Sequence, residues 1–476
     1  MACRRGCDSM SVSTDQHVST DCGGARAARV GIYMRQHQNL ILAMQWIMVA
    51  VYLVLLFASM FAPSGDAAQN KINTWHIAKV AFWGIWWPLV ILSVAFFGRA
   101  WCGLLCPEGA LSEWASNYGF GKGIPRWMKW AGWPFVTFVA VVAFGQLTSL
   151  HKYPKPTVLV LGGSTLAAVV VGFLYGRGKR VWCRHLCPVA GVFAILAKIA
   201  PIHFRVNEAV WESAPPGFRT SNQHAVNCAP LINVGHMESA SACHMCGRCA
   251  GERGAVQLSW RSPNAEALHG IASANLRMPD ENVRWLARLL VFGMIGLALG
   301  AFQWSVSPWF ASATRWAAGW LVAHQMPWLF HSPGHWWILT DYPQTNDVFT
   351  WFYGGMLLIY VLMEALLLGG WTIAWMRFVG VATGRAWQAF ACVLVPFAGT
   401  SLFVGSSLVT TAQLAHDNVT LPWVSEIGMA LLVLAAIWGT VLAWRTSPRR
   451  PFAAATGTLM AFALPLAAWA IQFFIW

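Results

Sequence analysis

The chain has 476 residues, of which 57% are hydrophobic and only 11% are charged. With a mean hydropathy of +0.51 and 30 tryptophans, it is too apolar for a soluble domain of average composition, and we expect an integral membrane protein. Lys and Arg outnumber Asp and Glu by 32 to 18. Most basic residues flank apolar stretches, a pattern that orients a membrane protein and does not indicate a nucleic-acid partner.

The first 38 residues are polar and rich in Ser and Arg, without the short apolar region and small-residue cleavage site of a signal peptide. We expect residues 1–38 to be a disordered cytoplasmic tail. Cys3 and Cys7 repeat a C-x3-C spacing found elsewhere in the chain. Because the segment has no apolar periodicity, we assign no role to these two residues or to Cys22.

Nine apolar stretches of roughly 20 residues predict transmembrane helices. They cover residues 40–62, 77–98, 131–149, 157–176, 286–304, 351–375, 387–410, 422–443 and 452–475. Basic residues gather at alternate ends of these stretches, which predicts an inner (cytoplasmic) membrane protein with its amino terminus inside and its carboxyl terminus outside. The expected fold is therefore all-α and multi-pass.

A polar stretch, residues 201–283, interrupts the apolar pattern on the predicted cytoplasmic side. It separates a four-helix unit, residues 39–200, from a five-helix unit, residues 284–476, to which the sequence assigns no role. The Trp-rich stretch 305–350 is predicted to lie in the outer membrane interface.

The four-helix unit contains an internal repeat. The nine residues from Arg99 to Pro107 recur 81 residues later, from Arg180 to Pro188, with six of nine positions identical. Each copy holds a C-x3-C-P motif directly after an even-numbered helix, so both copies reach the same membrane surface. The four thiols belong to Cys102, Cys106, Cys183 and Cys187.

Three interpretations of these four thiols remain open at this point. They could ligate an iron-sulfur cluster, form a dithiol/disulfide couple or contact a metal ion, or be small buried apolar side chains. The duplication argues against the last interpretation.

The polar insertion contains the strongest metal-binding motif, Cys243-His-Met-Cys246-Gly-Arg-Cys249. A C-x2-C-x2-C loop wraps an iron-sulfur cluster, whereas structural zinc sites more often use two separate C-x2-C knuckles. The insertion is therefore predicted to be a small ferredoxin-like module. Where a ferredoxin would supply a fourth Cys followed by Pro, this chain has Arg253, and Cys228 is the nearest substitute.

Together these motifs resemble those of the membrane-bound polyferredoxins, 4Fe-4S binding proteins with twin C-x3-C-P motifs. Similar proteins are the membrane ferredoxin subunit of periplasmic nitrate reduction, the regulator of nitrous-oxide respiration and the copper-handling assembly factor of the cbb3-type oxidase. The resemblance covers residues 77–260. This chain departs from the pattern in three ways: it has no flavin-bearing amino-terminal domain, no complete tandem ferredoxin cassette, and about five additional helices from residue 286 onward.

The resemblance implies a membrane-bound electron-transfer protein that relays electrons between a quinone or cytoplasmic donor and a respiratory or assembly partner. It also implies [4Fe-4S] clusters, one at the insertion cysteines and a second at the twin motifs. The protein would be a component of an oxidoreductase system rather than a stand-alone enzyme. The alternatives are a copper-reducing or copper-handling factor for oxidase assembly and a redox sensor.

Other ionisable residues deserve separate interpretations. Glu364 and Glu426 fall in predicted membrane helices. One interpretation is that their carboxyl groups take part in proton or quinone chemistry; the alternative is that they are protonated and hydrogen-bonded between helices. Cys392 is interpreted as a packing residue. Six histidines on the predicted outer side could bind copper or haem, but we favour ordinary interfacial residues: His76, His151, His324, His331, His335 and His416.

Overall fold

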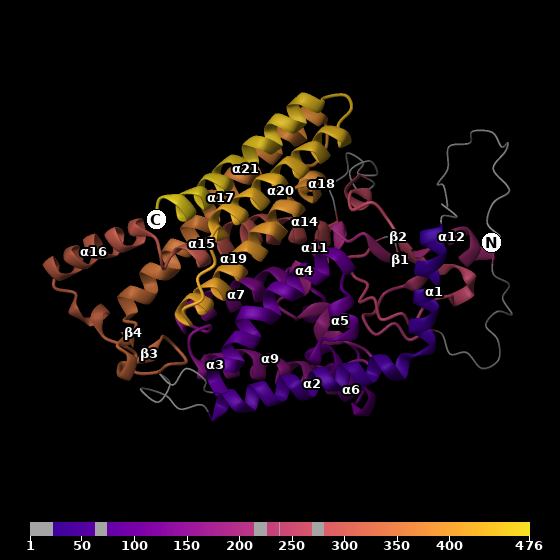
Figure 1. The fold of residues 1–476 in the computed structure, drawn as a ribbon, viewed down its shortest axis with the longest axis horizontal. Helices are drawn as coiled ribbons and strands as arrows, with labels where there is room; N and C mark the ends of the chain where they lie inside the picture. The colour runs from indigo at the N-terminus through magenta and orange to yellow at the C-terminus, as the bar shows by residue number, and fades with distance from the viewer. Residues whose placement is uncertain (1–21, 62–73, 214–225, 238, 269–279) are drawn as a thin grey trace.

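The computed structural model describes residues 22–61, 74–213, 226–237, 239–268 and 280–476. Within these ranges the chain is an all-α membrane protein with two small antiparallel strand pairs (Figure 1). Cys3 and Cys7 lie outside the described residues.

Eight helical segments of the described residues are long and apolar enough to span a membrane. Three of them include a π-helical stretch, labelled η2, η4 or η9. In chain order the segments are α2 (Gln38–Met60); α3 (Thr74–Lys79), η2 (Val80–Trp86) and α4 (Trp87–Phe97); α8 (Pro154–Thr157), η4 (Val158–Gly162) and α9 (Gly163–Leu174); α14 (Glu281–Arg288), η9 (Leu289–Leu297) and α15 (Ala298–Gln303); α17 (Trp351–Thr383); α18 (Trp387–Phe390), η12 (Ala391–Leu394) and α19 (Val395–His416); α20 (Val424–Thr446); and α21 (Pro451–Phe474).

The ninth predicted span, 131–149, is the shorter helix α7 (Trp133–Leu147). Its 15 residues rise only about 22 Å, less than a hydrocarbon core of roughly 30 Å. Helix α1 and the carboxyl terminus lie at opposite ends of the helical region (Figure 1). Ends on opposite sides of a membrane require an odd number of passes. The eight long segments of the described residues therefore need a ninth, and we count α7 as that pass.

The segment 281–303 lies at the centre of the helical region. Of its most apolar window, 72% is buried inside the protein, compared with 22–28% for the first three spans. Small residues allow this close packing: a Cβ added at Gly296 would lie 2.7 Å from the Cα of Ala365 in α17. Its side chains also join a large buried cluster with α19 and α21, including Met294, Phe397 and Trp469.

The duplicated motifs form two similar helical turns at the ends of α4 and α9. The first copy forms α5 (Ala100–Leu104) and continues into α6 (Pro107–Tyr118). The second forms α10 (Val181–His185), followed by α11 (Ala190–Leu196) and the 3-10 turn η5 (Ala197–Ile199). In the first copy, Pro107 opens α6 because a helix's first residue needs no N–H donor.

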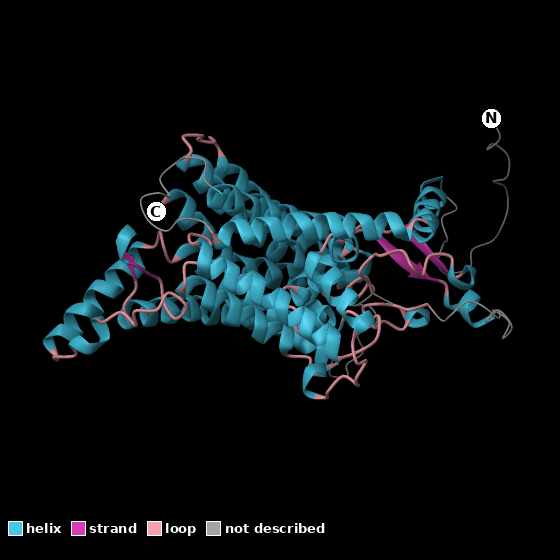
Figure 2. Cartoon of the chain, turned by 90° about the horizontal axis from the view of Figure 1, so that it is seen from below, coloured by secondary structure: helices cyan, strands magenta, loops and turns pink. Residues whose placement is uncertain are grey.

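The insertion is built on the strand pair β1 (Ile202–Val206) and β2 (Val256–Trp260), with Phe204 opposite Leu258. Its short helices are α12 (Glu208–Ser213), η7 (Val234–His236) and η8 (Glu252–Gly254). Phe204 and Leu258 are buried in a small core that also contains Ala27 from the amino-terminal segment. The strands lie at one end of the molecule, beyond the helix ends (Figure 2).

Our expectation of a disordered amino-terminal tail is wrong for residues 22–36. Residues Cys22–Gln36 form helix α1, which packs on β2. A Cβ added at Gly31 would lie 3.0 Å from the Cβ of Leu258, so a glycine lets helix and strand approach closely. The helix is stabilised by this contact with residues more than 200 positions away, which apolar periodicity alone did not reveal.

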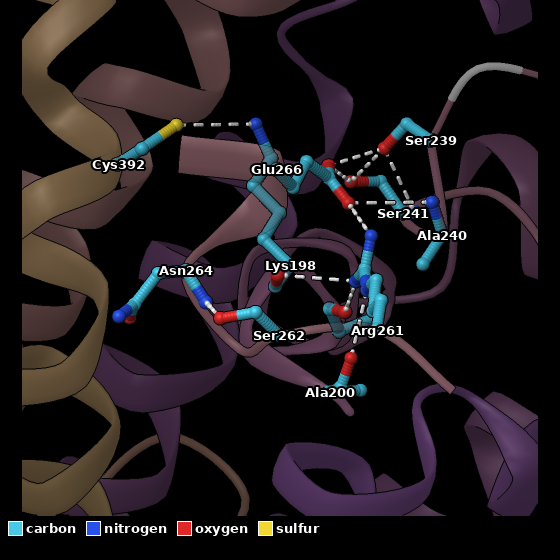
Figure 3. A network of polar contacts seen from close by, with 11 residues as sticks. Lys198, Ala200, Ser239, Ala240, Ser241, Arg261, Ser262, Asn264, Glu266 and Cys392 are labelled. Carbon is cyan, nitrogen blue, oxygen red and sulfur yellow. Dashed lines mark hydrogen bonds and ion pairs between the residues drawn. The ribbon is translucent and has the colours of Figure 1, made fainter. Parts of the chain in front are cut away.

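Figure 3 shows how the insertion is fastened to the helices. Arg261 forms an ion pair with Glu266 at 2.7 Å and donates to the backbone carbonyls of Ala197, Lys198 and Ala200. Trp438 of α20 donates to Asn264 at 2.7 Å. The insertion is thus attached to both halves of the helical region.

The opposite end carries α16 (Pro308–Ala323), which projects from the bundle (Figures 1 and 2). Its Trp309, Trp316 and Trp320 are exposed, as expected for side chains at a membrane interface. The remaining short elements are η3 (Trp127–Lys129), η10 (Pro327–Phe330), β3 (Asp341–Tyr342), η11 (Pro343–Thr345) and β4 (Asp347–Val348).

Candidate iron-sulfur site

The twin C-x3-C-P motifs bring their four cysteines into one group, which we call the motif thiols: Cys102, Cys106, Cys183 and Cys187. The thiol of Cys106 lies within electrostatic range of Cys183 and Cys102. Cys187 is likewise within range of Cys183 and Cys106. Two sequence segments about 80 residues apart therefore contribute to one cluster of sulfur atoms.

Burial disfavours ionisation of the motif thiols to thiolates. It raises the pKa of Cys183 to about 12, an effect that Arg180 partly opposes. Burial also raises the pKa of Cys106 well above the usual value, as do the neighbouring thiols Cys183 and Cys102. A thiolate here consequently needs a compensating positive charge, which a metal centre supplies.

The insertion contributes the second group, the insertion thiols: Cys228, Cys243, Cys246 and Cys249. The thiol of Cys243 lies within electrostatic range of the other three, and burial raises the pKa of Cys249 to about 12. The loop bends back on itself through left-handed φ values at Met245 (+55°) and Gly247 (+76°).

Cys228, which the sequence offers as the nearest substitute for a fourth cysteine, lies close to the other insertion thiols. It approaches from the loop before η7 and is within electrostatic range of Cys246. Arg253, which stands where a ferredoxin would continue with cysteine, instead stacks over the ring of Trp211 at 4.5 Å and donates to its carbonyl. The geometry thus brings Cys228 to the insertion thiols and gives Arg253 a packing role.

No three His, Cys, Asp or Glu side chains of the described ranges are grouped closely enough to hold a single metal ion. A cubane iron-sulfur cluster needs a wider cage, roughly 6–7 Å across. Buried donors without partners test whether these surroundings suit such an anionic group. Arg99 Nε, Arg180 Nη2 and both ring nitrogens of His244 are buried and have no hydrogen-bond partner in the described structure. In the neutral His244 ring, one of the two nitrogens carries the N–H donor.

These unpartnered donors lie beside the thiols. Arg180 interacts electrostatically with Cys183 and Cys246, one thiol from each group, and His244 follows Cys243 directly in sequence. Burial and the nearby Arg99 and Arg180 lower the pKa of His244 well below its usual value. Buried donors normally have acceptors, and the sulfides and thiolates of a cluster would provide them. The residues present therefore fit an iron-sulfur cluster.

The two thiol groups adjoin each other. Gly103, between Cys102 and Cys106, faces the insertion loop so closely that an added Cβ would clash with the carbonyl oxygen of His244 and lie 3.0 Å from the nitrogen of Cys246. Gln45 of α2 donates to the carbonyl of Gly103 at 2.6 Å. The motif and insertion loops are thus in direct backbone contact.

Sequence reasoning missed the charged residues between the thiol groups. Arg99 and Arg180 occupy equivalent positions of the repeat, but the sequence pattern distinguishes neither from the other basic residues at the ends of apolar stretches. Both are buried, with 4% and 1% of their surface exposed. Their identity in both copies, directly before a Cys motif, was the available signal.

The other candidate residues do not join these groups. Glu364 lies in α17 beside Gly300 of α15, and Glu426 is exposed in the first turn of α20. The thiol of Cys392 lies 3.7 Å from Nζ of Lys198, and the backbone of Cys22 begins α1.

The predicted outer histidines are dispersed within the described residues. His324 and His335 stack on Trp320 and Trp337, while Nε2 of His76 lies 3.1 Å from Oδ2 of Asp417. Burial lowers the pKa of His151 to about 4. His331 is exposed, and nothing is described for the side chain of His416.

Comparison with known proteins supports an iron-sulfur assignment. A family model described as a 4Fe-4S binding domain matches residues 80–126 and 159–207, which contain the two copies of the repeat. The chain is 25% identical over 249 residues to YccM of Escherichia coli (strain K12), whose name describes an electron transport protein. It is 29% identical over 138 residues to protein NirI of Paracoccus denitrificans (strain Pd 1222).

These alignments are partial. They cover 45% and 24% of this chain, and 66% and 19% of YccM and NirI respectively. No solved structure matches the chain. The family match and the two relatives show that the chain is similar to membrane-associated 4Fe-4S proteins, in agreement with the resemblance to the membrane-bound polyferredoxins.

Proposed function

We propose that this protein is a membrane electron-transfer protein that holds two [4Fe-4S] clusters, one on the motif thiols and one on the insertion thiols. It relays electrons between a quinone or cytoplasmic donor and a respiratory or assembly partner. The observation that carries the proposal is the backbone contact between the two loops that carry the four-thiol groups, with unpartnered buried nitrogens of Arg99, Arg180 and His244 beside them.

The division of work follows from the chemistry of the site. A bound cluster supplies one-electron transfer, while the chain sets its position, its exposure to water and its electrostatic surroundings. Trp101, next to Cys102, packs edge-on against Trp86 with ring centroids 5.2 Å apart. Such apolar side chains restrict water near the motif thiols.

Iron analysis tests the proposal directly. Anaerobically purified protein should contain about eight iron and eight sulfide per chain, the content of two cubane clusters. Cys246→Ser and Cys106→Ser should each reduce the iron content by about half and remove one EPR signal. Cys392→Ser, outside both groups, should keep all of the iron.

The outcomes separate the two halves of the proposal. Full iron retained in Cys106→Ser would remove the motif cluster, and full iron retained in Cys246→Ser would remove the insertion cluster. Quinol added to membranes should reduce the clusters, which is measured as a change in their EPR signals. Copper binding without iron would instead support the metal-handling alternative.

A further inference from the structure

A buried arginine lies between the two thiol groups. Arg180 is 1% exposed and its guanidinium donates from Nη1 to the carbonyl of Cys102 and from Nε to Glu113 Oε2, the latter at 2.7 Å. Its charge also interacts with Cys183 and Cys246. One side chain therefore touches the first motif, belongs to the second motif and faces the insertion loop.

Glu113 of α6 extends this connection into the insertion. Its Oε1 forms an ion pair at 2.5 Å with Nη1 of Arg248, the residue directly before Cys249. Burial opposes ionisation of this carboxyl, but Arg180 and Arg248 hold the pKa of Glu113 below its usual value. The carboxylate is therefore charged, and the two arginines share it.

The repeat differs between its two copies where the insertion docks. The first copy has Gly103, in contact with the insertion loop, and the second copy has Arg184 at the equivalent position. Only a residue without a Cβ fits against His244 and Cys246, so the insertion loop packs on the first copy. Arg99, the counterpart of Arg180, donates to the carbonyl of Ser241, two residues before Cys243.

We propose that Arg180 is the positioning residue that joins the two centres, by fixing the first motif through Cys102 and the insertion loop through Glu113 and Arg248. The inference rests on the proposed function, because it assumes a cluster on each thiol group. The arginine holds both loops at one separation and places a positive charge between them. Reduction adds negative charge to a cluster, so this positive charge raises the reduction potential of both centres.

Three variants of the full-length protein test the proposal. Arg180→Gln removes the charge, Arg180→Lys keeps the charge but loses the forked geometry, and Arg261→Gln is the control. Arg261 has a comparable buried pair with Glu266 in the same insertion (Figure 3), but it fastens the insertion on the side of Lys198 and Ala200. Iron content, EPR redox titration and thermal unfolding of the metal-free protein are measured for each.

Arg180→Gln should lower the midpoint potential of both clusters and reduce the magnetic coupling between them. Arg180→Lys should keep the potentials closer to those of the wild type but still reduce the coupling. In the metal-free protein, both Arg180 variants should unfold the insertion at a lower temperature. Arg261→Gln should also lower that temperature, but leave potentials and coupling unchanged.

A further pair of variants covers the case in which Arg180→Gln fails to fold. Gly103→Ala keeps every charge but forces the two loops apart, so it should reduce magnetic coupling. Gly123→Ala, where nothing lies within 4 Å of the added Cβ, should have no effect.

Two results would count against different claims. Suppose that the wild-type protein holds two clusters. If potentials and coupling are then unchanged in both Arg180 variants, or if coupling is unchanged in Gly103→Ala, the positioning role is wrong, but the proposed function stands. If the wild-type protein lacks one of the clusters, the proposed function fails first.

Discussion

Left-handed backbone angles are concentrated around the insertion thiols. Met245, Gly247, Gly251, Arg253 and Gly254 all have φ between +51° and +76°. Such angles cost an ordinary L-residue about 1–2 kcal/mol, so glycine is favoured there. Two of them, Met245 and Gly247, turn the backbone of the loop between Cys243 and Cys249.

Gly247→Ala should destabilise the insertion. The substitution introduces the backbone cost of about 1–2 kcal/mol. It also places a Cβ 2.6 Å from the Cβ of Met34 in α1, so either the loop or the helix must move. We expect a lower unfolding temperature and loss of the insertion cluster, measured by thermal unfolding and iron content.

Gly254→Ala is the matched control. Its φ is +69°, but nothing lies within 4 Å of an added Cβ. It should show the backbone cost alone and retain more iron than Gly247→Ala. Equal losses in the two variants would mean that α1 does not press on the cysteine loop in solution.

At the scale of single residues, the sequence was informative about cysteines and less informative about charges. The C-x2-C-x2-C motif and the duplicated C-x3-C-P motif located seven thiols, and Cys228 was the nearest substitute for an eighth. The structure brings the eight thiols into two groups of four. The burial of Arg99 and Arg180 could not be predicted, because basic residues beside apolar helices usually mark the cytoplasmic ends of membrane spans. Their partners, Ser241 and Glu113, come from other parts of the fold.

At the scale of elements, α1 contributes most to the insertion after the strand pair. Ala27 is buried against the strands, and Arg35 pairs with Glu252 at 3.1 Å. Gln38, the first residue of α2, donates to the carbonyl of Cys246. Helix α1 therefore braces the loop that carries the insertion thiols.

Gly31→Leu should detach α1 from the strand pair. The Cβ of the new side chain would already lie 3.0 Å from the Cβ of Leu258, so the larger branched group has no room. Limited proteolysis of the purified protein should then cut within residues 22–36 faster than in the wild type. Val30→Ala, at a position that is 52% exposed, should leave the cleavage rate unchanged.

If Gly31→Leu resists proteolysis as well as the wild type does, the α1–β2 contact does not hold the helix.

The sequence did not predict α1 because residues 22–36 are rich in Ala, Gly and Arg and form no long apolar stripe. The apolar spans, in contrast, are recognisable from composition alone. The short helix α7 was also expected, although at 131–149 its predicted length was too great.

At the scale of the whole molecule, the insertion and α16 lie at opposite ends of the helical region (Figure 1). Basic residues surround the insertion end, including Lys129, Lys179 and Arg184. Since basic residues favour the cytoplasmic side, we infer that the insertion faces the cytoplasm and α16 the outside.

Reporter fusions should reveal this orientation. Alkaline phosphatase, which is active only outside the cytoplasm, should be active when fused after Trp476 and inactive when fused after Ser213. Green fluorescent protein should give the reverse pattern at the two positions. Activity of phosphatase at Ser213 would invert the topology and place both thiol groups outside.

The central segment 281–303 has a consequence for biogenesis. It is synthesised only after every cysteine of both thiol groups has been translated, yet the helices on either side of it meet through its small residues. Until it inserts, α7 and α11 lack a protein neighbour that they have in the complete fold. A polypeptide ending before residue 281 would contain all eight thiols and still lack the helix against which α7 and α11 pack, so cofactor loading and completion of the helical region depend on different stretches of the chain.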